Sequence, residues 1–200
     1  MEAPDDVTWP TGLGHTLDFT QTEIVGTLWP ALQIHRPFFY HLSEGTDEAS
    51  RQHYMDLDMQ GTWAINGNLV AIHCTALQPS DFGRMTTAAG IVWSPLSNYL
   101  LYGKTTEVAA AKQAGVRIAL GADWSPSGSK NLLGEIKIAK FVSDNSGGLF
   151  SVEELVRMAT TTPAKMAQWD PYIGSIEAGK KADLLVVSGS SADGYGPPLR

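Results

Sequence analysis

Short apolar runs recur along the middle of the chain, and each is followed by a longer stretch of helix-forming residues. The apolar runs lie at 38–40, 69–72, 91–93 and 116–120. Because they are apolar at consecutive positions, they are typical of strands buried on both faces of a parallel sheet. The helix-forming stretches lie at 46–60, 80–89, 105–114, 131–142 and 151–159. A strand followed by a helix, four times over, predicts an α/β fold with a parallel sheet.

Local signals mark the ends of several predicted helices. Thr46 is the predicted N-cap of the first, because acidic residues follow it in the first turn. Ser151 and Glu154 fit a capping box, in which each side chain bonds the backbone N–H of the other. Gly115 should end the alanine-rich helix, since glycine readily adopts the left-handed conformation found after helices.

The two ends of the chain lack this alternation. Residues 8–14 are rich in Pro and Gly and predict a loop, whereas 18–32 are compatible with a short helix. Near the other end, 182–187 form an apolar run that predicts a strand. Residues 188–200 are rich in Gly, Ser and Pro and show no core pattern.

Composition narrows the class of protein. The 200 residues include 14 Lys and Arg against 21 Asp and Glu, a net charge of −7, without a basic stripe. We therefore expect no nucleic-acid partner and no binding to anionic membranes. No run of 18 apolar residues predicts a membrane span. Cys74 stands alone and the N-terminus lacks a signal pattern, so we expect a cytoplasmic protein.

Polar side chains follow each predicted strand. His41 and Glu44 come after the first, His73 after the second and Asp123 after the fourth; the third is followed by Ser97 and Asn98. Because active sites of parallel sheets gather at the carboxyl ends of strands, we expect one shared site.

Each of these residues has a structural interpretation when taken alone. A single histidine after a strand is more often a hydrogen-bonded structural residue than a ligand. An aspartate such as Asp123, before Trp-Ser-Pro, is usually a turn or cap residue. Cys74 fits a small buried hydrophobe better than a nucleophile. Their joint placement at successive strand ends is what favours a functional site.

Five segments, in this order, resemble the deaminase and chlorohydrolase branch of the amidohydrolase superfamily, which includes guanine deaminase, cytosine deaminase and triazine hydrolases. They are His-Leu-Ser-Glu at 41–44, Ala-Ile-His-Cys at 71–74, Trp-Ser-Pro-Leu-Ser-Asn at 93–98, Leu-Gly-Ala-Asp at 120–123, and the C-terminal signature formed by 161–165 and 173–184. The resemblance runs from about residue 36 to residue 187.

The resemblance implies a metal-dependent hydrolase that acts on C–N or C–halogen bonds of an N-heterocyclic small molecule. It implies that His41, His73 and Asp123 hold one divalent metal ion, zinc or alternatively iron. Catalytic roles fall on Glu44, His73 and Asp123, and substrate contacts on Trp93, Ser97 and Asn98. The chemistry is consistent, because zinc takes imidazole and carboxylate ligands and lowers the pKa of bound water to about 7.

The resemblance also implies the fold. Residues 1–168 should form the C-terminal half of a (β/α)₈ TIM barrel, and 169–200 the start of a small β domain. The alternative is a complete, small, doubly wound α/β domain. An open sheet with a bare edge would favour the half-barrel, and such an edge should drive homo-oligomerisation.

The family's first strand carries a His-x-His pair that this sequence lacks. No two of its five histidines are separated by one residue. We therefore expect a chain truncated at both ends that binds metal weakly and is inactive on its own. The alternative function is that of a non-catalytic binding or structural domain that keeps the fold but lacks the metal centre.

Overall fold

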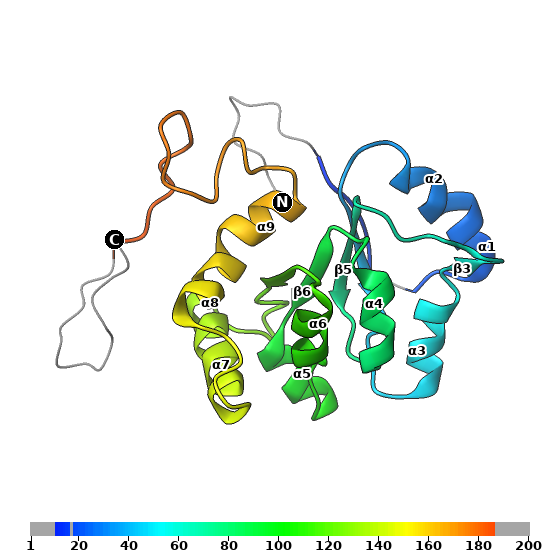
Figure 1. The fold of residues 1–200 in the computed structure, drawn as a ribbon, viewed down its shortest axis with the longest axis horizontal. Helices are drawn as coiled ribbons and strands as arrows, with labels where there is room; N and C mark the ends of the chain where they lie inside the picture. The colour runs from blue at the N-terminus through cyan, green and yellow to red at the C-terminus, as the bar shows by residue number, and fades with distance from the viewer. Residues whose placement is uncertain (1–10, 17, 187–200) are drawn as a thin grey trace.

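The computed structural model describes residues 11–16 and 18–186, and its main feature is a parallel sheet of five strands (Figure 1). In spatial order the strands are β1 (Leu13–His15), β2 (Phe38–Leu42), β5 (Leu69–His73), β6 (Gly90–Trp93) and β7 (Ile118–Leu120). Every neighbouring pair is parallel. The predicted parallel α/β sheet is confirmed, with one strand more than expected.

The additional strand is β1, where the Pro- and Gly-rich sequence predicts a loop. Leu13 pairs with Phe38 and His15 with Tyr40. The prediction for residues 8–14 is therefore wrong at Leu13 and Gly14, because the partner strand supplies backbone hydrogen bonds that local composition does not reveal.

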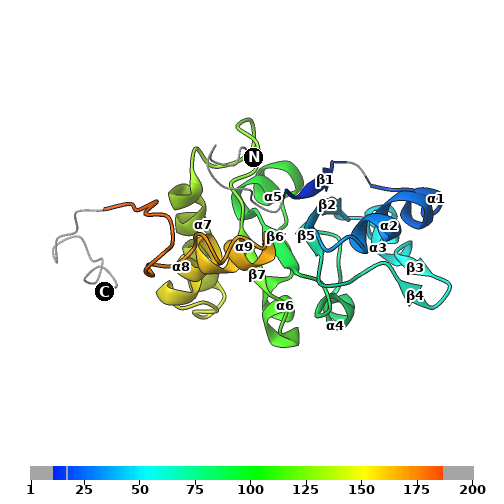
Figure 2. The same ribbon diagram turned by 90° about the horizontal axis from the view of Figure 1, so that it is seen from above.

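The order of the strands in the sheet is their order along the chain. A doubly wound sheet reverses its strand order at a switch point, and the described strands show no reversal. Helices α4 (Phe82–Met85) and α6 (Val108–Ala114) lie on the same side of the sheet in both views (Figures 1 and 2). The arrangement is that of successive β/α units and argues against the doubly wound alternative.

Alternate residues of β2, β5, β6 and β7 enter different hydrophobic clusters. Phe38 and Tyr40 belong to the main core, which the strands share with the helices. Phe39 and Val92, on the opposite face, contact a smaller cluster and are only half-buried. That cluster consists of Val70, Ala89, Ala119 and Met166. One face of the sheet is thus thoroughly covered and the other only in part.

The remaining elements connect or flank the strands. They are α1 (Gln21–Glu23), a π-helical turn (Ile24–Leu28), α2 (Trp29–Leu32), α3 (Glu48–Met55), the hairpin β3 (Asp58–Met59) and β4 (Thr62–Trp63), a 3₁₀ turn (Pro79–Asp81), α5 (Pro95–Tyr102), α7 (Leu132–Asn145), α8 (Val152–Ala159) and α9 (Thr161–Met166). None of the helices within 11–16 and 18–186 is long and apolar enough to cross a membrane.

Two of the three predicted helix-end signals are confirmed. Ser151 and Glu154 form the predicted capping box, and Gly115 ends α6 with a φ of 84°. The N-cap of α3 is Asp47 rather than Thr46, because the Asp47 carboxylate accepts a hydrogen bond from the backbone N–H of Ser50.

Four helical regions differ from the prediction. The stretch predicted at 46–60 is helical only over Glu48–Met55, because its last residues enter the β3–β4 hairpin. The stretch predicted at 80–89 forms only a 3₁₀ turn and one turn of α-helix, α4. Helices α5 and α9 were not predicted.

The C-terminal part of the described chain is irregular. Residues 182–186 have no regular secondary structure, so the predicted strand at 182–187 is not formed over them. Val187 and the predicted tail at 188–200 lie outside the described residues. The division into domains at residue 169 stays a prediction.

Candidate active site at the carboxyl ends of the strands

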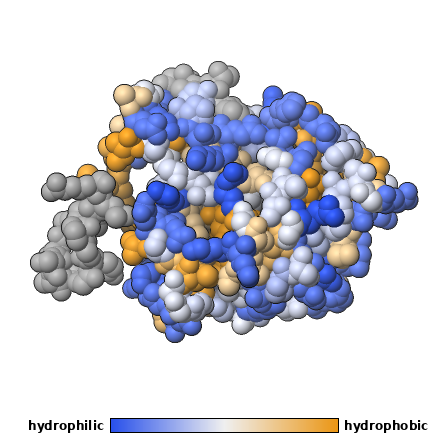
Figure 3. All heavy atoms as spheres, viewed as in Figure 1, coloured by the Kyte–Doolittle hydropathy of each residue, from blue (hydrophilic) through white to orange (hydrophobic). Residues whose placement is uncertain are grey.

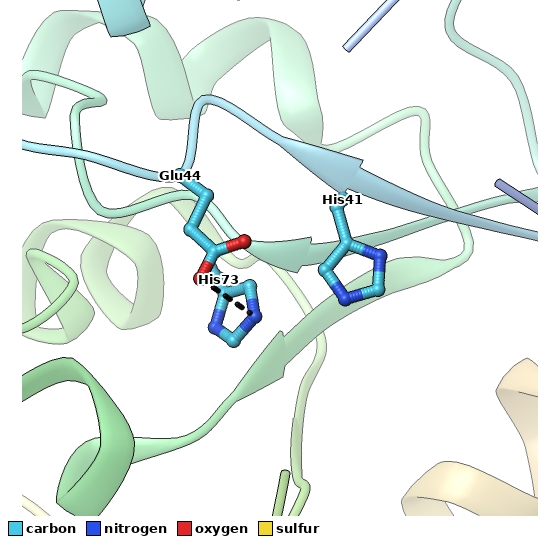
Figure 4. A group of neighbouring side chains, drawn as sticks. All are labelled: His41, Glu44 and His73. Carbon is cyan, nitrogen blue, oxygen red and sulfur yellow. Dashed lines mark ion pairs between the residues drawn. The ribbon is translucent and has the colours of Figure 1, made fainter. Parts of the chain in front are cut away.

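Pairing between β2 and β5 brings two histidines together. His41 lies opposite Ile72, one position from the pair formed by Leu42 and His73. The two imidazole rings are 5.2 Å apart between centroids and inclined by 48°. Glu44, in the loop after β2, points its carboxylate toward the same place (Figure 4). Residues 32 positions apart in sequence (73 − 41) thus meet at the carboxyl edge of the sheet.

The backbone at this edge takes an unusual conformation. Ser43, His73, Cys74 and Asp123 all have positive φ, between 51° and 66°, although none is glycine. Such left-handed residues are disfavoured by clashes with the side chain, and they gather at functional sites. Here each follows or ends a strand, so the conformation turns the side chain away from its regular direction along the pleat.

Two carboxylates flank the His73 ring. The His73 Nε2 atom lies 3.5 Å from Glu44 Oε1 and 4.0 Å from Asp123 Oδ2. The His73 side chain is 1% exposed, whereas those of Glu44 and Asp123 are 25% and 16% exposed. Burial, the largest influence, lowers the pKa of His73, and the two carboxylates only partly oppose it. His73 is therefore held as a neutral imidazole.

The Glu44 oxygen that faces His73 also accepts a hydrogen bond. The Tyr102 hydroxyl donates to Glu44 Oε1 over 2.8 Å. Burial, followed by the neighbouring Glu44 carboxylate, raises the pKa of Tyr102, so the phenol stays protonated and remains a donor. This contact orients the carboxylate toward His73.

Three side chains of this cluster fit a metal ion. His41, Glu44 and His73 each offer one ligand atom, and these atoms lie within 4.8 Å of one another. Two ligands of one zinc ion are at most about 4.4 Å apart, so a small closure would suffice. Imidazole nitrogen and carboxylate oxygen are donors that zinc accepts. The predicted ligands His41 and His73 are in this group, together with Glu44; Asp123 contacts His73 from outside it.

The three residues predicted to contact the substrate are buried, and their side chains form hydrogen bonds with other side chains of the protein. The Trp93 indole packs in the main core and donates to Thr105 Oγ1 over 2.7 Å. The Ser97 hydroxyl is 2.8 Å from that of Ser127, and Asn98 Nδ2 is 3.1 Å from His73 Nδ1. Substrate contact by Trp93, Ser97 and Asn98 stays a prediction.

Sequence reasoning missed residues on the β1 side of the site. His15 ends β1, and its carbonyl oxygen is 3.2 Å from His41 Nδ1. Asp18 accepts a hydrogen bond from the Ser43 backbone N–H over 3.4 Å, and its other oxygen is 3.4 Å from His53 Nε2. The sequence signal for this region is the His-x-x-Asp spacing of His15 and Asp18, which indicates a site only if Leu13–His15 is already known to be a strand.

A buried carboxylate, also missed, connects the loops after β6 and β7. Glu135 of α7 is 0% exposed; it accepts hydrogen bonds from the backbone N–H of Leu96, over 2.9 Å, and from the Ser129 hydroxyl. Burial raises the pKa of the Glu135 carboxyl. The contacts link the start of α5 to the loop that carries Asp123.

Comparisons with known proteins agree with this geometry. A model of the amidohydrolase family matches residues 39–197. A 5-methylthioadenosine/S-adenosylhomocysteine deaminase of Symbiobacterium thermophilum is 30% identical over 166 residues, which are 74% of this chain and 36% of the relative.

Solved structures share the fold of this chain. Guanine deaminase of Escherichia coli superposes with a TM-score of 0.67 at 26% identity, covering 84% of this chain and 42% of that one. An atrazine chlorohydrolase of Arthrobacter aurescens TC1, complexed with zinc, superposes with a TM-score of 0.68 at 19% identity, covering 86% and 40%. The chain thus spans about two fifths of these two solved chains, and little more than a third of the deaminase matched in sequence.

Proposed function

Because this chain belongs to the amidohydrolase family, we propose that its site takes part in metal-dependent hydrolysis of a C–N bond in a small N-heterocyclic substrate. The observation that carries the proposal is the cluster of His41, Glu44 and His73 at the carboxyl edge of the sheet, with Asp123 beside it. C–halogen bonds are the alternative target, since a structural neighbour is a chlorohydrolase.

The side chains divide the work in a way that their contacts support. His41 would ligate the metal, with Asp123 as a second ligand. His73, also predicted as a ligand, would serve in its predicted catalytic role, because its Nε2 atom faces the Glu44 and Asp123 carboxylates at 3.5 and 4.0 Å. Glu44 would accept a proton from the attacking water molecule on its carboxylate and pass it to the leaving group, as general acid–base catalysis requires. Tyr102, by donating to Glu44 Oε1, keeps the carboxylate turned toward the site. A bound zinc ion would lower the pKa of a water molecule to about 7.

The ligand set also limits what these 200 residues do. No two of their histidines are separated by one residue, so the family's His-x-His pair is missing from the sequence. Catalytic zinc sites commonly take three protein ligands and a water molecule. We propose that the chain alone binds zinc weakly and has little activity. A non-catalytic amidohydrolase-like domain is the second candidate, and the missing pair is what favours it.

Zinc titration of the 200-residue chain separates the two candidates. We expect one zinc ion to bind, and His41→Ala to weaken binding by more than the roughly 10–100-fold typical of residues that only orient a ligand. His35→Ala is the matched control, because His35 is exposed and outside the cluster. Absence of stoichiometric zinc binding, or equal losses in both variants, would favour the non-catalytic domain.

Activity is tested after supplying the missing histidines. The chain should be co-expressed with the N-terminal half of a related deaminase and assayed against aminopurines and aminopyrimidines. We expect turnover in the mixture and little in the chain alone. Robust turnover by the chain alone would show that the ligand set is wrong.

The fold and its assembly complete the proposal. We propose that residues 1–168 correspond to half of a (β/α)₈ barrel and 169–200 to the start of a β segment. In the described sheet β1 and β7 are edge strands with unpaired backbone groups, which promote association. Apolar patches lie between the hydrophilic side chains on one face of the molecule (Figure 3). Because of the two edge strands and these patches, we expect homo-oligomers, which light scattering would detect.

A further inference from the structure

His73 is held by a chain of hydrogen bonds that begins deep in the core. The Trp93 indole N–H donates to Thr105 Oγ1 over 2.7 Å, and Thr105 Oγ1 lies 3.3 Å from Asn98 Oδ1. Asn98 Nδ2 in turn lies 3.1 Å from His73 Nδ1. Trp93 and Asn98 are 0% exposed and His73 is 1% exposed, so both ends of the chain are shielded from water, whereas Thr105 is half-buried.

The placement of the Asn98 amide sets the direction of the whole chain. Thr105 accepts from the Trp93 indole N–H, which can only donate, and the Thr105 hydroxyl hydrogen is available to Asn98 Oδ1. With its carbonyl oxygen occupied in this way, Asn98 presents its NH₂ group to His73. His73 Nδ1 must then accept, which requires that it carries no proton.

We propose that Asn98 is a positioning residue that fixes the tautomer of His73, with the ring proton on Nε2, facing Glu44 and Asp123. The inference rests on the proposed function for its purpose, because a proton on Nε2 makes His73 a hydrogen-bond donor to whatever lies between the two carboxylates. The assignment also gives Asn98 a role that differs from substrate contact.

His41 provides the contrast within the same site. Its Nδ1 faces the carbonyl oxygen of His15 at 3.2 Å, and a carbonyl only accepts. His41 therefore carries its proton on Nδ1 and leaves Nε2 free, the usual arrangement of a metal-ligating histidine. Two histidines whose rings are 5.2 Å apart are thus held in opposite tautomers by their neighbours.

Thr106 fixes the same histidine through its backbone. The Thr106 hydroxyl donates to the His73 carbonyl oxygen over 2.6 Å and lies 3.4 Å from Asn98 Oδ1. This contact holds the left-handed backbone of His73, whose φ is 66°. Ring and backbone are therefore positioned from the same α5–α6 segment.

Nitrogen-15 NMR of histidine rings in the metal-free 200-residue chain tests the proposal, with a His73→Phe spectrum to identify the His73 signals. We expect Nε2 protonated and Nδ1 unprotonated in the parent chain. In Asn98→Asp, a carboxylate oxygen replaces the amide NH₂, so we expect the Nδ1 signal to move to the protonated range. The His41 signals should not change.

Asn145→Asp is the matched control, because Asn145 is the exposed last residue of α7, its side chain donates to the Phe141 carbonyl oxygen, and its substitution should leave His73 unchanged. If circular dichroism shows that Asn98→Asp does not fold, Thr105→Val decides: removing the orienting hydroxyl should give a mixture of His73 tautomers. A protonated Nδ1 in the parent chain, or an unchanged tautomer in a folded variant, would overturn the proposal. The readout needs no turnover, so inactivity of the chain would refute the proposed function and leave this inference standing.

Discussion

At the amino edge of the sheet, the strands begin with apolar residues such as Phe38, Leu69 and Ile118, all buried in the main core. At the carboxyl edge the same strands lead into polar groups, and His73 and Asp123 have positive φ. Residues with strained backbones and buried polar side chains cost free energy, typically 1–3 kcal/mol each for the backbone. Phe38, Leu69 and Ile118 at the amino edge are apolar, and none of the three has a positive φ.

The contrast indicates that the two ends of the strands have different roles. The apolar amino ends and centres stabilise the fold, whereas the residues at the carboxyl ends lower its stability and hold reactive groups in fixed positions. Substitutions at the carboxyl edge should therefore change chemistry more than stability, and substitutions at the amino edge should do the reverse.

The largest effect should come from Glu44→Gln at the carboxyl edge. In the protein supplied with the missing histidines, we expect turnover to fall by roughly 10²–10⁴-fold, the usual size of general acid–base assistance. The free energy of unfolding should change little, because the amide keeps the shape of the carboxyl group. Steady-state kinetics measures the loss. Glu48→Gln, on the exposed side of α3, is the control and should leave turnover unchanged; an unaltered kcat in Glu44→Gln would remove Glu44 from the mechanism.

Leu69→Ala at the amino edge should have the opposite signature. Leu69 is 0% exposed, so truncation should lower the free energy of unfolding by about 2–5 kcal/mol while zinc affinity in the folded chain is kept. Urea unfolding gives the first quantity and calorimetric titration the second. Leu133→Ala, at a position that is 52% exposed, should cost less than about 0.5 kcal/mol. A large loss of zinc affinity in folded Leu69→Ala would erase the division between the edges.

Ser43→Gly should stabilise the protein. Ser43 has a φ of 51°, and within the described residues its buried hydroxyl oxygen has no hydrogen-bond partner. Removing both penalties should raise the free energy of unfolding by about 1 kcal/mol, beyond the entropic cost of glycine. The comparison is Ala71→Gly in the regular part of β5, which should lower it by about 1 kcal/mol. If both variants are destabilised equally, the carboxyl edge is not strained at Ser43.

The smallest effect should be a pH dependence that originates at Glu135. Burial raises the pKa of this carboxyl above its value in the unfolded chain, so the folded state holds the proton more tightly. The free energy of unfolding should therefore fall as pH rises from the unfolded pKa, about 4.3, to the folded pKa, and stay level above it. Chemical unfolding across this range should show the slope in the parent chain and lack it in Glu135→Gln. A slope shared by both would place its origin elsewhere.

Hydrophobic patterning predicted the sheet well, because short runs of consecutive apolar residues such as Leu69–Ile72, bounded by turn signals, are typical of buried strands. It missed β1, whose three residues depend on pairing with β2. It also missed α5, which carries Ser97 and Asn98; both side chains are buried against tertiary partners. Local sequence does not encode those partners.

The candidate site was predictable in its members and less so in its geometry. His41, Glu44 and His73 could be placed together because strand ends share one edge of a parallel sheet. Contacts over long sequence distances could not: Tyr102 reaches Glu44 across 58 positions, and Asn98 reaches His73 across 25. The left-handed backbone conformation of His73 and Asp123 could not be predicted from the sequence either, since neither residue type requires it.

The strictly sequential order of the strands bears on how the site comes into being during synthesis. Each strand of the sheet pairs with the strand that precedes it, so every new β/α unit adds to a surface that already exists. Chains grow from the N-terminus, at about 5–20 residues per second. His41, Glu44 and His73 are joined by β2 and β5 alone, and can meet while the segment that carries Asp123 is still being translated. During translation, His41 and His73 would thus be synthesised first, and Asp123 would follow some seconds later.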